Sequence, residues 1–272
     1  MTHDLAQSSD APLQIRTENR VRWLTLNQPE QRNPLSSTML RLLREALADA
    51  AEDREVRAVV IAAQGPVFCA GHDLKEMGRQ ADESADDQAA RVKSVLESCA
   101  KTMLSIVHSP RAIIACVQGT ATAAGCQLVS ASDLAVAADF ARFCTPGVNI
   151  GGFCTTPLVG IGRNIHRKHA MAMALTGDSF SARDAERFGL VNEVVPAADL
   201  LEHTKALAER IASKSAEGIR EGKADFYRQV EMPLEEAFTY ANDAMLRAMI
   251  TEDSKEGVQA FFEKRSPEWR DV

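Results

Sequence analysis

Two segments of the chain combine very small side chains with sharp breaks in apolar runs. In the first, residues 112–139, the run AIIACV has the length and β-branching of a buried strand, and Gln118-Gly119 interrupts it. The small residues TATAAG follow, and residues 124–132 are typical of a helix. A helix that begins at such a turn directs unpaired N–H groups and a positive dipole end at one point. This segment can therefore hold an anion, or an oxygen that becomes anionic during a reaction.

A second segment, residues 58–75, supplies the same kind of backbone. A buried strand at 58–63 is expected to end at Gln64-Gly65-Pro66, and FCAGHDL follows as a tight loop. Two loops with exposed donors, each after a strand, are what an oxyanion hole made of two N–H groups needs. For the first segment alone, the alternative is that Ala-Ala-Gly only lets a helix pack closely on a sheet. The second segment favours the chemical interpretation.

The other side chains that could bind metal or act as nucleophiles do not form known patterns. The six cysteines contain no CxxC pair and lie mostly among apolar or small residues, which indicates free thiols in a reducing compartment. His166 and His169 have helical spacing, but no Cys or carboxylate completes a metal site. GxSxG, P-loop and GxGxxG motifs do not occur. We therefore expect no metal site and find no support for serine-hydrolase, NTP or dinucleotide chemistry.

Composition and charge limit the classes of function further. The formal net charge of −7 over 272 residues argues against a general nucleic-acid binder, although it leaves room for a local basic pocket. No apolar run reaches the ~20 residues of a membrane helix. The first residues, MTHDLAQSSDAPLQ, lack both an apolar core and an Arg-rich character, so they resemble neither a signal peptide nor a transit peptide. We expect a cytoplasmic protein with no membrane span and no nucleic-acid partner.

Apolar spacing predicts the elements that position these segments. Strands are expected at residues 13–16, 21–26, 58–63, 113–117, 133–137 and 190–194. Helices are expected at about 36–53, 88–107, 124–132, 158–162 and 167–176, and 198–265 should be mostly helical with breaks near Gly218 and Met232-Pro233. The polar segment 78–87 and the Gly-, Pro- and Thr-rich segment 141–157 are interpreted as loops.

Three motifs occur in a familiar order: FCAGHDLKEM, VQGTATAAGCQL and LTGDSFSARDAERFGLVNEVV. Together they resemble the enoyl-CoA hydratase/isomerase (crotonase) family over residues 21–265. Within it, TAAGCQL and TPGVNIGGFCTTP most resemble the branch of enoyl-CoA hydratase domain-containing protein 3. The resemblance implies an α/β fold: a crotonase (ClpP-like) spiral of ββα units with a C-terminal helical oligomerisation region. It implies an acyl-CoA-binding core at 1–197, a helical region at 198–272, and a homotrimer or a hexamer of two trimers.

The resemblance also assigns the backbone donors. The family polarises an acyl-CoA thioester with two N–H groups, which by motif are the amides of His72 and Ala124. Ala124 stands where the family usually has glycine, a change that preserves the donor but adds a methyl group that narrows the approach. His72 stands where the family usually has Ala or Ser. Its imidazole could crowd the site or join the chemistry, and the simpler alternative is a side chain turned to solvent.

Hydration of an enoyl thioester also needs a base to activate water and an acid to protonate the α-carbon. The family's hydratases use two glutamates, and this chain has Gln127 and Gly147 at the corresponding positions. Each acid–base group is worth roughly 10²–10⁴-fold in rate, whereas an oxyanion donor is worth roughly 10²–10³-fold. We therefore expect weak hydration. Cys154 is the candidate substitute if its thiol is activated at a helix start, and the alternative is a buried, inert thiol.

The segment from Arg32 to Leu35 resembles the part of the family that lines the adenine and pantetheine end of CoA, and Lys264 resembles a contact to a CoA phosphate, in its own or a neighbouring subunit. For both, the alternative is ordinary surface charge. The polar segment 78–87 borders the acyl pocket in the family and could act as a lid. No cofactor is expected beyond the coenzyme A of the substrate. The residues carried over as substrate-binding are Arg32, Leu35, Ala70, His72, Asp73, Leu74, Lys75, Ala124 and Lys264.

Two classes of function are compatible with this sequence. The first is an enzyme that acts on an acyl-CoA, either as a weak hydratase/isomerase or in a reaction that needs less base, such as decarboxylation or thioester hydrolysis. The second is a non-catalytic acyl-CoA binder or a regulatory relative. Both predict an acyl-CoA thioester as the partner, and only the first predicts turnover. Because the donor amides of His72 and Ala124 are retained, we favour an enzyme of low or altered activity.

Overall fold

The computed structural model of the chain describes residues 10–270. Residues 1–9, on which the cytoplasmic expectation partly rests, and residues 271–272 lie outside the described part. Within residues 10–270, no helix has both the length and the apolar character needed to cross a membrane.

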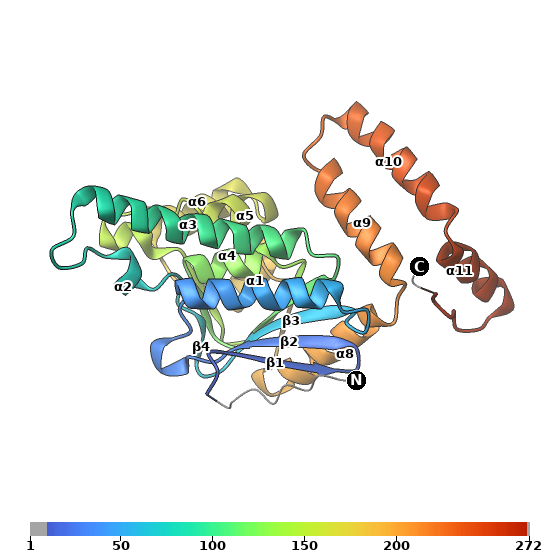
Figure 1. The fold of residues 1–272 in the computed structure, drawn as a ribbon, viewed down its shortest axis with the longest axis horizontal. Helices are drawn as coiled ribbons and strands as arrows, with labels where there is room; N and C mark the ends of the chain where they lie inside the picture. The colour runs from blue at the N-terminus through green and yellow to red at the C-terminus, as the bar shows by residue number, and fades with distance from the viewer. Residues whose placement is uncertain (1–9, 271–272) are drawn as a thin grey trace.

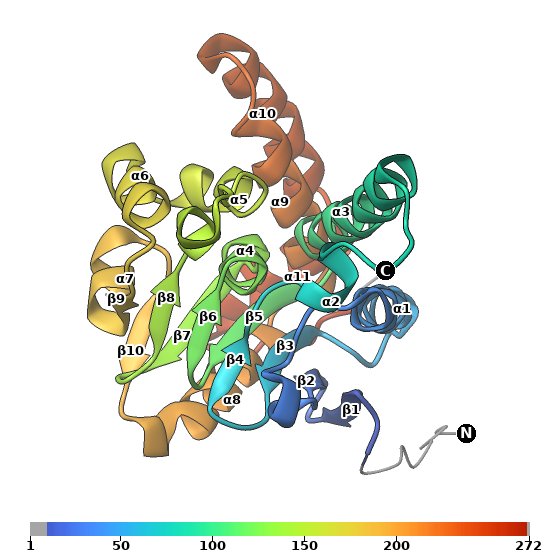
Figure 2. The same cartoon turned by 90° about the vertical axis from the view of Figure 1, so that its left-hand side faces the viewer.

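A six-stranded sheet forms the centre of the body (Figures 1 and 2). β1 and β2 form an antiparallel hairpin, and all later neighbours in this sheet pair in parallel. A parallel sheet covered on both faces has continuous apolar strands, which is why most of these strands could be predicted. In spatial order they are β1 (Leu13–Glu18), β2 (Val21–Leu26), β3 (Ala58–Ala63), β5 (Ala112–Val117), β7 (Leu134–Ala138) and β10 (Glu193–Val195).

The bounds expected for β10 are wrong. Leu190 and Val191 are buried but belong to the turn that follows Gly189 (φ +91°), and the strand starts only at Glu193. The residues of this turn are apolar because they are buried in the core, and a short apolar run cannot be distinguished from a strand in the sequence.

A second sheet of four short strands was not predicted. Segments of two or three residues are too short to show a period of alternation, so these were expected to be loops. β4 and β6 pair in parallel, and each belongs to one of the two segments rich in small residues. This sheet therefore holds those two segments side by side. Its order is β4 (Val67–Cys69), β6 (Thr120–Thr122), β8 (Arg142–Cys144) and β9 (Phe180–Ser181).

Helices cover both faces of the central sheet (Figure 2). Neighbouring residues of β5 show the two layers: Ile113 belongs to the core under α1, α3 and α4, whereas Ile114 belongs to the core under α8. Successive side chains of a strand point to opposite faces, so one apolar strand supplies both cores. The helices are α1 (Ser37–Glu52), α3 (Ala85–Val107), α4 (Ala124–Ala131) and α8 (Leu200–Ala212).

The last three helices extend away from the body (Figure 1). We call α9 (Ala216–Gln229), α10 (Leu234–Met249) and α11 (Glu252–Glu263) the arm. Lys223 fastens α9 to the body, because its Nζ donates to the carbonyls of Ile106 and Arg111 at 3.0 Å and to Asp133 Oδ2 at 2.7 Å.

The break expected near Gly218 occurs slightly earlier, at residues 213–215 between α8 and α9. Ser215 caps α9 by accepting a hydrogen bond from the Gly218 N–H at 3.0 Å, so this glycine lies inside the first turn. The break at Pro233 is confirmed, since α10 begins at the next residue.

The remaining helices are short and connect the layers. The segment 78–87 is only partly a loop, because Ser84 caps α3 and the helix begins at Ala85. The segment 141–157 contains β8 and a 3₁₀ helix as well as loop. The connecting helices are α2 (Leu74–Met77), α5 (Pro157–Asn164), α6 (Arg167–Thr176), α7 (Ala182–Phe188), η1 (Pro29–Gln31), η2 (Pro146–Ile150) and η3 (Ala197–Asp199).

Candidate active site

The loop between β4 and α2 carries the first expected donor, the His72 amide. Gly71 has a φ of +88°, and a Cβ at this residue would lie 3.2 Å from the Ala124 nitrogen and 3.0 Å from the Thr122 carbonyl oxygen. Glycine therefore supplies both the left-handed backbone and the space in which the two loops meet. The amide of His72 comes directly after this contact.

The chain ahead of α1 runs along the same loop. The Ala70 N–H donates to the Arg32 carbonyl at 3.0 Å, and the Leu35 N–H donates to the Gly71 carbonyl at 2.7 Å. Leu35 is fully buried, whereas the Arg32 side chain is exposed. The structure thus brings together the loop and the segment that the sequence assigned to CoA.

The second expected donor lies at the start of α4. Ala123 has φ 51° and ψ −116°, a conformation that residues other than glycine rarely adopt, and its N–H donates to the Cys144 carbonyl at 2.9 Å. This backbone turns the chain from β6 into the helix, so that Ala124 becomes the first helical residue. The first N–H groups of a helix have no acceptor within it.

Neither the His72 amide nor the Ala124 amide donates a hydrogen bond to any group within residues 10–270. The two loops that carry them touch at Gly71, and the second amide lies at the positive end of α4. Two fixed donors in this arrangement can stabilise negative charge on an oxygen that sits between them.

The His72 imidazole is not simply turned to solvent, so the simpler expectation for this side chain is wrong. Its Nε2 atom is buried and has no hydrogen-bond partner within the described part of the chain. Burial lowers the pKa of the imidazole, and the nearby Glu76 carboxylate opposes that shift. The neutral form of the ring is therefore favoured, and that form can accept a proton.

Gln127 lies buried on α4, with 7% of its surface exposed. Its Oε1 accepts a long contact of 3.8 Å from the Cys99 thiol on α3. A neutral amide beside a neutral thiol can orient a water molecule, but it cannot take the proton from one.

Gly147, on η2, leaves no room for a side chain. A Cβ there would lie 2.9 Å from the Cys154 nitrogen and 3.0 Å from the Phe153 carbonyl carbon, both of them backbone atoms. The obstacle is space and not backbone conformation, since Gly147 is absent from the glycines with positive φ. The loop itself therefore leaves no space for a carboxylate side chain at residue 147.

Cys154 is the neighbour of Gly147 in space and not an activated nucleophile. Its thiol is buried and accepts a hydrogen bond from the Gly147 N–H at 3.3 Å. Burial is the main influence on the thiol and raises its pKa, and this hydrogen bond only partly opposes the shift. The structure supports the inert alternative for this residue.

The structure also gathers thiols that the sequence left scattered. Cys126 lies close enough to Cys69, Cys144 and Cys154 to interact with them electrostatically, and Cys69 interacts in the same way with Cys99. Burial raises the pKa of each of these groups. Buried or half-buried, they are neutral, weakly polar groups, and no cluster able to hold a metal occurs among residues 10–270.

The other expected substrate-binding residues are not all brought together. Asp73 caps α2 by accepting a hydrogen bond from the Lys75 N–H at 2.9 Å, while the side chains of Leu74 and Lys75 are exposed beside the loop. Lys264 ends α11, toward the opposite end of the molecule from α2 (Figure 1). Lys264 therefore does not reach the site of its own chain.

Comparison with known proteins settles the class. The family model described as enoyl-CoA hydratase/isomerase matches residues 16–272. The chain belongs to this family. The mouse protein named enoyl-CoA hydratase domain-containing protein 3, mitochondrial, is 42% identical over 93% of this chain and 83% of that protein. The family and branch expected from the sequence are both confirmed.

Solved structures of this family confirm the expected crotonase fold. The crystal structure of human enoyl-CoA hydratase domain-containing protein 3 matches with a TM-score of 0.89 at 41% identity and covers 95% of this chain and 100% of that one. An enoyl-CoA hydratase from Mycobacterium smegmatis also matches with a TM-score of 0.89, at 46% identity over 95% of this chain and 98% of that one. The cytoplasmic location stays a prediction.

Proposed function

We propose that this protein binds an acyl-CoA thioester and holds its carbonyl oxygen between the amides of His72 and Ala124. The observation that carries the proposal is the pair of unpartnered amides on two touching loops. The thioester oxygen gains negative charge when the adjacent carbon reacts, and each preorganised donor is worth roughly 10²–10³-fold in rate. Membership of the family supports coenzyme A as the carrier of the acyl group.

The same residues argue for slow hydration. The polar group at the first carboxylate position is the neutral Gln127, and backbone atoms occupy the space beside Gly147. Attack by water needs a base, and a missing base costs roughly 10²–10⁴-fold. Reactions that need the enolate but no activated water, such as decarboxylation, fit these residues better than hydration does.

The second candidate function is acyl-CoA binding without turnover. The blocked position at Gly147 favours it, since this loop could not hold a catalytic carboxylate without moving. A binder and an enzyme share the oxyanion contact and differ only in whether product appears.

Calorimetric titration and product analysis separate these cases. Butyryl-CoA should bind more tightly than S-butyl-CoA, the thioether that lacks the carbonyl oxygen. Two hydrogen bonds of about 0.5–1.5 kcal/mol each predict a difference of roughly 5- to 150-fold. Equal affinities would contradict the oxyanion contact. Mass spectrometry of a panel of CoA thioesters, including a 2-carboxyacyl-CoA, then decides between enzyme and binder by the presence of product.

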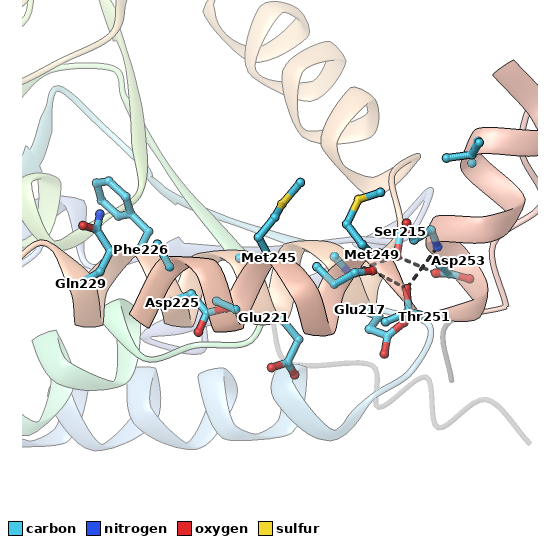
Figure 3. Close-up of a pocket in the computed structure, with 18 of the residues that line it drawn as sticks. Ser215, Glu217, Glu221, Asp225, Phe226, Gln229, Met245, Met249, Thr251 and Asp253 are labelled. Atoms are coloured by element: carbon cyan, nitrogen blue, oxygen red, sulfur yellow. Dashed lines mark hydrogen bonds between the residues drawn. The ribbon is translucent and has the colours of Figure 1, made fainter. Parts of the chain in front are cut away.

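For the assembly, we propose that the arm packs against further copies of this chain in a trimer or in two trimers. A groove of about 970 Å³ lies between α9, α10 and α11, lined mostly by apolar side chains that include Phe226, Met245 and Met249 (Figure 3). Phe261 and Phe262 on α11 are more than three quarters exposed. Large apolar side chains gathered on a projecting arm mark a surface that another protein covers. In such an assembly, Lys264 could approach the site of a neighbouring subunit.

A further inference from the structure

His72 places a buried, unsatisfied nitrogen beside one of the two donor amides. Buried polar atoms almost always have a hydrogen-bond partner, and leaving one without a partner costs roughly 1–3 kcal/mol. Nε2 of His72 has no partner within residues 10–270. An atom of this kind at a ligand site indicates a partner that the ligand itself supplies.

The charged groups around the ring are engaged elsewhere. Glu76, one helical turn later on α2, is the charged side chain that acts on the imidazole, and it favours the protonated form. Its carboxylate accepts hydrogen bonds from the Ser37 N–H at 2.9 Å and the Ser37 hydroxyl at 2.6 Å. The Asp73 carboxylate caps α2. The imidazole therefore keeps Nε2 available while both carboxylates are held by local donors.

The other candidate groups of the site cannot move a proton near neutral pH. Gln127 does not ionise, Gly147 has no side chain, and burial raises the pKa of the Cys154 thiol. Burial raises the pKa of the Cys69 thiol to about 12 and that of the Cys99 thiol to about 11. Histidine is the side chain whose charge changes in the useful range.

We propose that Nε2 of His72 is the acid–base group for the α-carbon of the bound thioester. This inference rests on the proposed function. The Nε2 lone pair takes the α-proton, and the electrons of the C–H bond form the C=C bond of an enolate. The enolate oxygen carries the charge between the amides of His72 and Ala124. The imidazolium then returns a proton to the same carbon, so no oxidant, reductant or water is consumed. The backbone N–H of His72 thus stabilises the thioester oxygen, and its side chain transfers the proton of the α-carbon.

Deuterium exchange tests this step without requiring hydration. Butyryl-CoA is incubated in D₂O with the parent protein, and α-deuteration is followed by mass spectrometry. His72→Gln and His72→Ala keep the backbone amide that contacts the thioester oxygen, and the affinity of each for butyryl-CoA is measured so that exchange is compared at saturation. Exchange should fall by roughly 10²–10⁴-fold in both. The exposed His108 provides the control, since His108→Gln should exchange like the parent.

The pH profile distinguishes a proton-transfer role from a structural one. In the parent, exchange should rise with pH through an ionisation below the ordinary histidine pKa of 6.5, because burial lowers the pKa of His72. This rise of the exchange rate with pH should be absent from both His72 variants. If the substitutions only disturbed the structure, the rate would fall but would still rise with pH. Nitrogen-15 NMR of labelled histidine provides a second readout, in which butyryl-CoA should shift the Nε2 signal of His72.

The possible failures are distinguishable. A parent that binds butyryl-CoA but incorporates no deuterium overturns the inference and leaves the proposed function intact. The same holds if His72→Gln keeps both the rate and its rise with pH, or if the Nε2 signal does not respond to ligand. A parent that binds no CoA thioester of any chain length overturns both.

Discussion

The carbonyl oxygen of Cys69 lies where a side chain on Gly125 would begin: a Cβ on Gly125 would be 2.2 Å from it. Cys69 ends β4 and Gly125 is the second residue of α4, so this contact presses the two donor loops together. Close packing and the proposed oxyanion site are therefore compatible. The packing that small residues permit is what brings the two loops that carry these amides into contact.

Gly125→Ala should destabilise the protein and weaken thioester binding. The added methyl group meets backbone atoms, which cannot rotate away, and overpacking of this kind costs about 1–3 kcal/mol. Gly162→Ala is the matched control, because Gly162 also lies in a helix and has nothing within 4 Å of its Cβ position. There, alanine should stabilise by about 0.5–1 kcal/mol. Urea denaturation and butyryl-CoA titration of both variants check this, and equal effects would contradict it.

Restoring the two carboxylates should not restore hydration. Two carboxylates that hold one water act as a unit. The sequence alone therefore predicts that the gain in hydration rate of the double variant, Gln127→Glu with Gly147→Glu, exceeds the product of the gains of the two single variants, provided that the loop accepts a side chain. The backbone of Phe153 and Cys154 blocks that side chain. Gly147→Glu should therefore lower stability by about 1–3 kcal/mol, and the double variant should stay below the product. The test is the rate of crotonyl-CoA hydration by the parent, the two single variants and the double variant, with circular dichroism to check folding. A double variant that exceeds the product would contradict the prediction.

Alkaline pH should weaken the fold through its buried thiols. Burial raises the pKa of Cys116 from 9.0 to about 11. Because the folded-state pKa is raised, the stabilisation is complete below about pH 9 and is lost as the pH rises toward 11. One extra proton bound by the folded state corresponds to about 1.4 kcal/mol per pH unit in this window. Cys116→Ala should flatten the fall in unfolding free energy between pH 9 and pH 11, and parallel curves would contradict the assignment.

Assembly should depend on the arm and not on exposed apolar residues in general. Met245 on the arm and Leu175 on α6 are both 61% exposed in the single chain. Met245→Glu places a charge in the groove and should lower the molar mass measured by light scattering at micromolar concentration. Leu175→Glu should leave it unchanged. A monomeric parent would refute the proposed assembly, and dissociation by Leu175→Glu alone would move the interface to α6.

Elements whose side chains repeat with a clear period could be read from the sequence. Strand Ala58–Ala63 and helix Arg167–Thr176 have the predicted bounds. A strand buried on both faces is a continuous apolar run, and a helix shows helical spacing of its apolar residues, so both can be recognised from consecutive residues. The motifs around His72 and Ala124 identified the two donor loops for the same reason. Each is a short contiguous segment whose backbone conformation depends on its own small residues.

Contacts between distant segments decided the rest. The four-stranded sheet was missed because β4 and β6 are too short to show a period, and they are strands only through pairing with segments far away in the chain. The burial of His72 Nε2, the contact between Gln127 and Cys99, and the closed space at Gly147 are likewise set by residues far away in the chain or by the path of a loop. Sequence thus determined the two loops that carry the proposed donor amides. Tertiary packing decided which side chains can act there, because burial and available space depend on neighbours that a linear reading does not place.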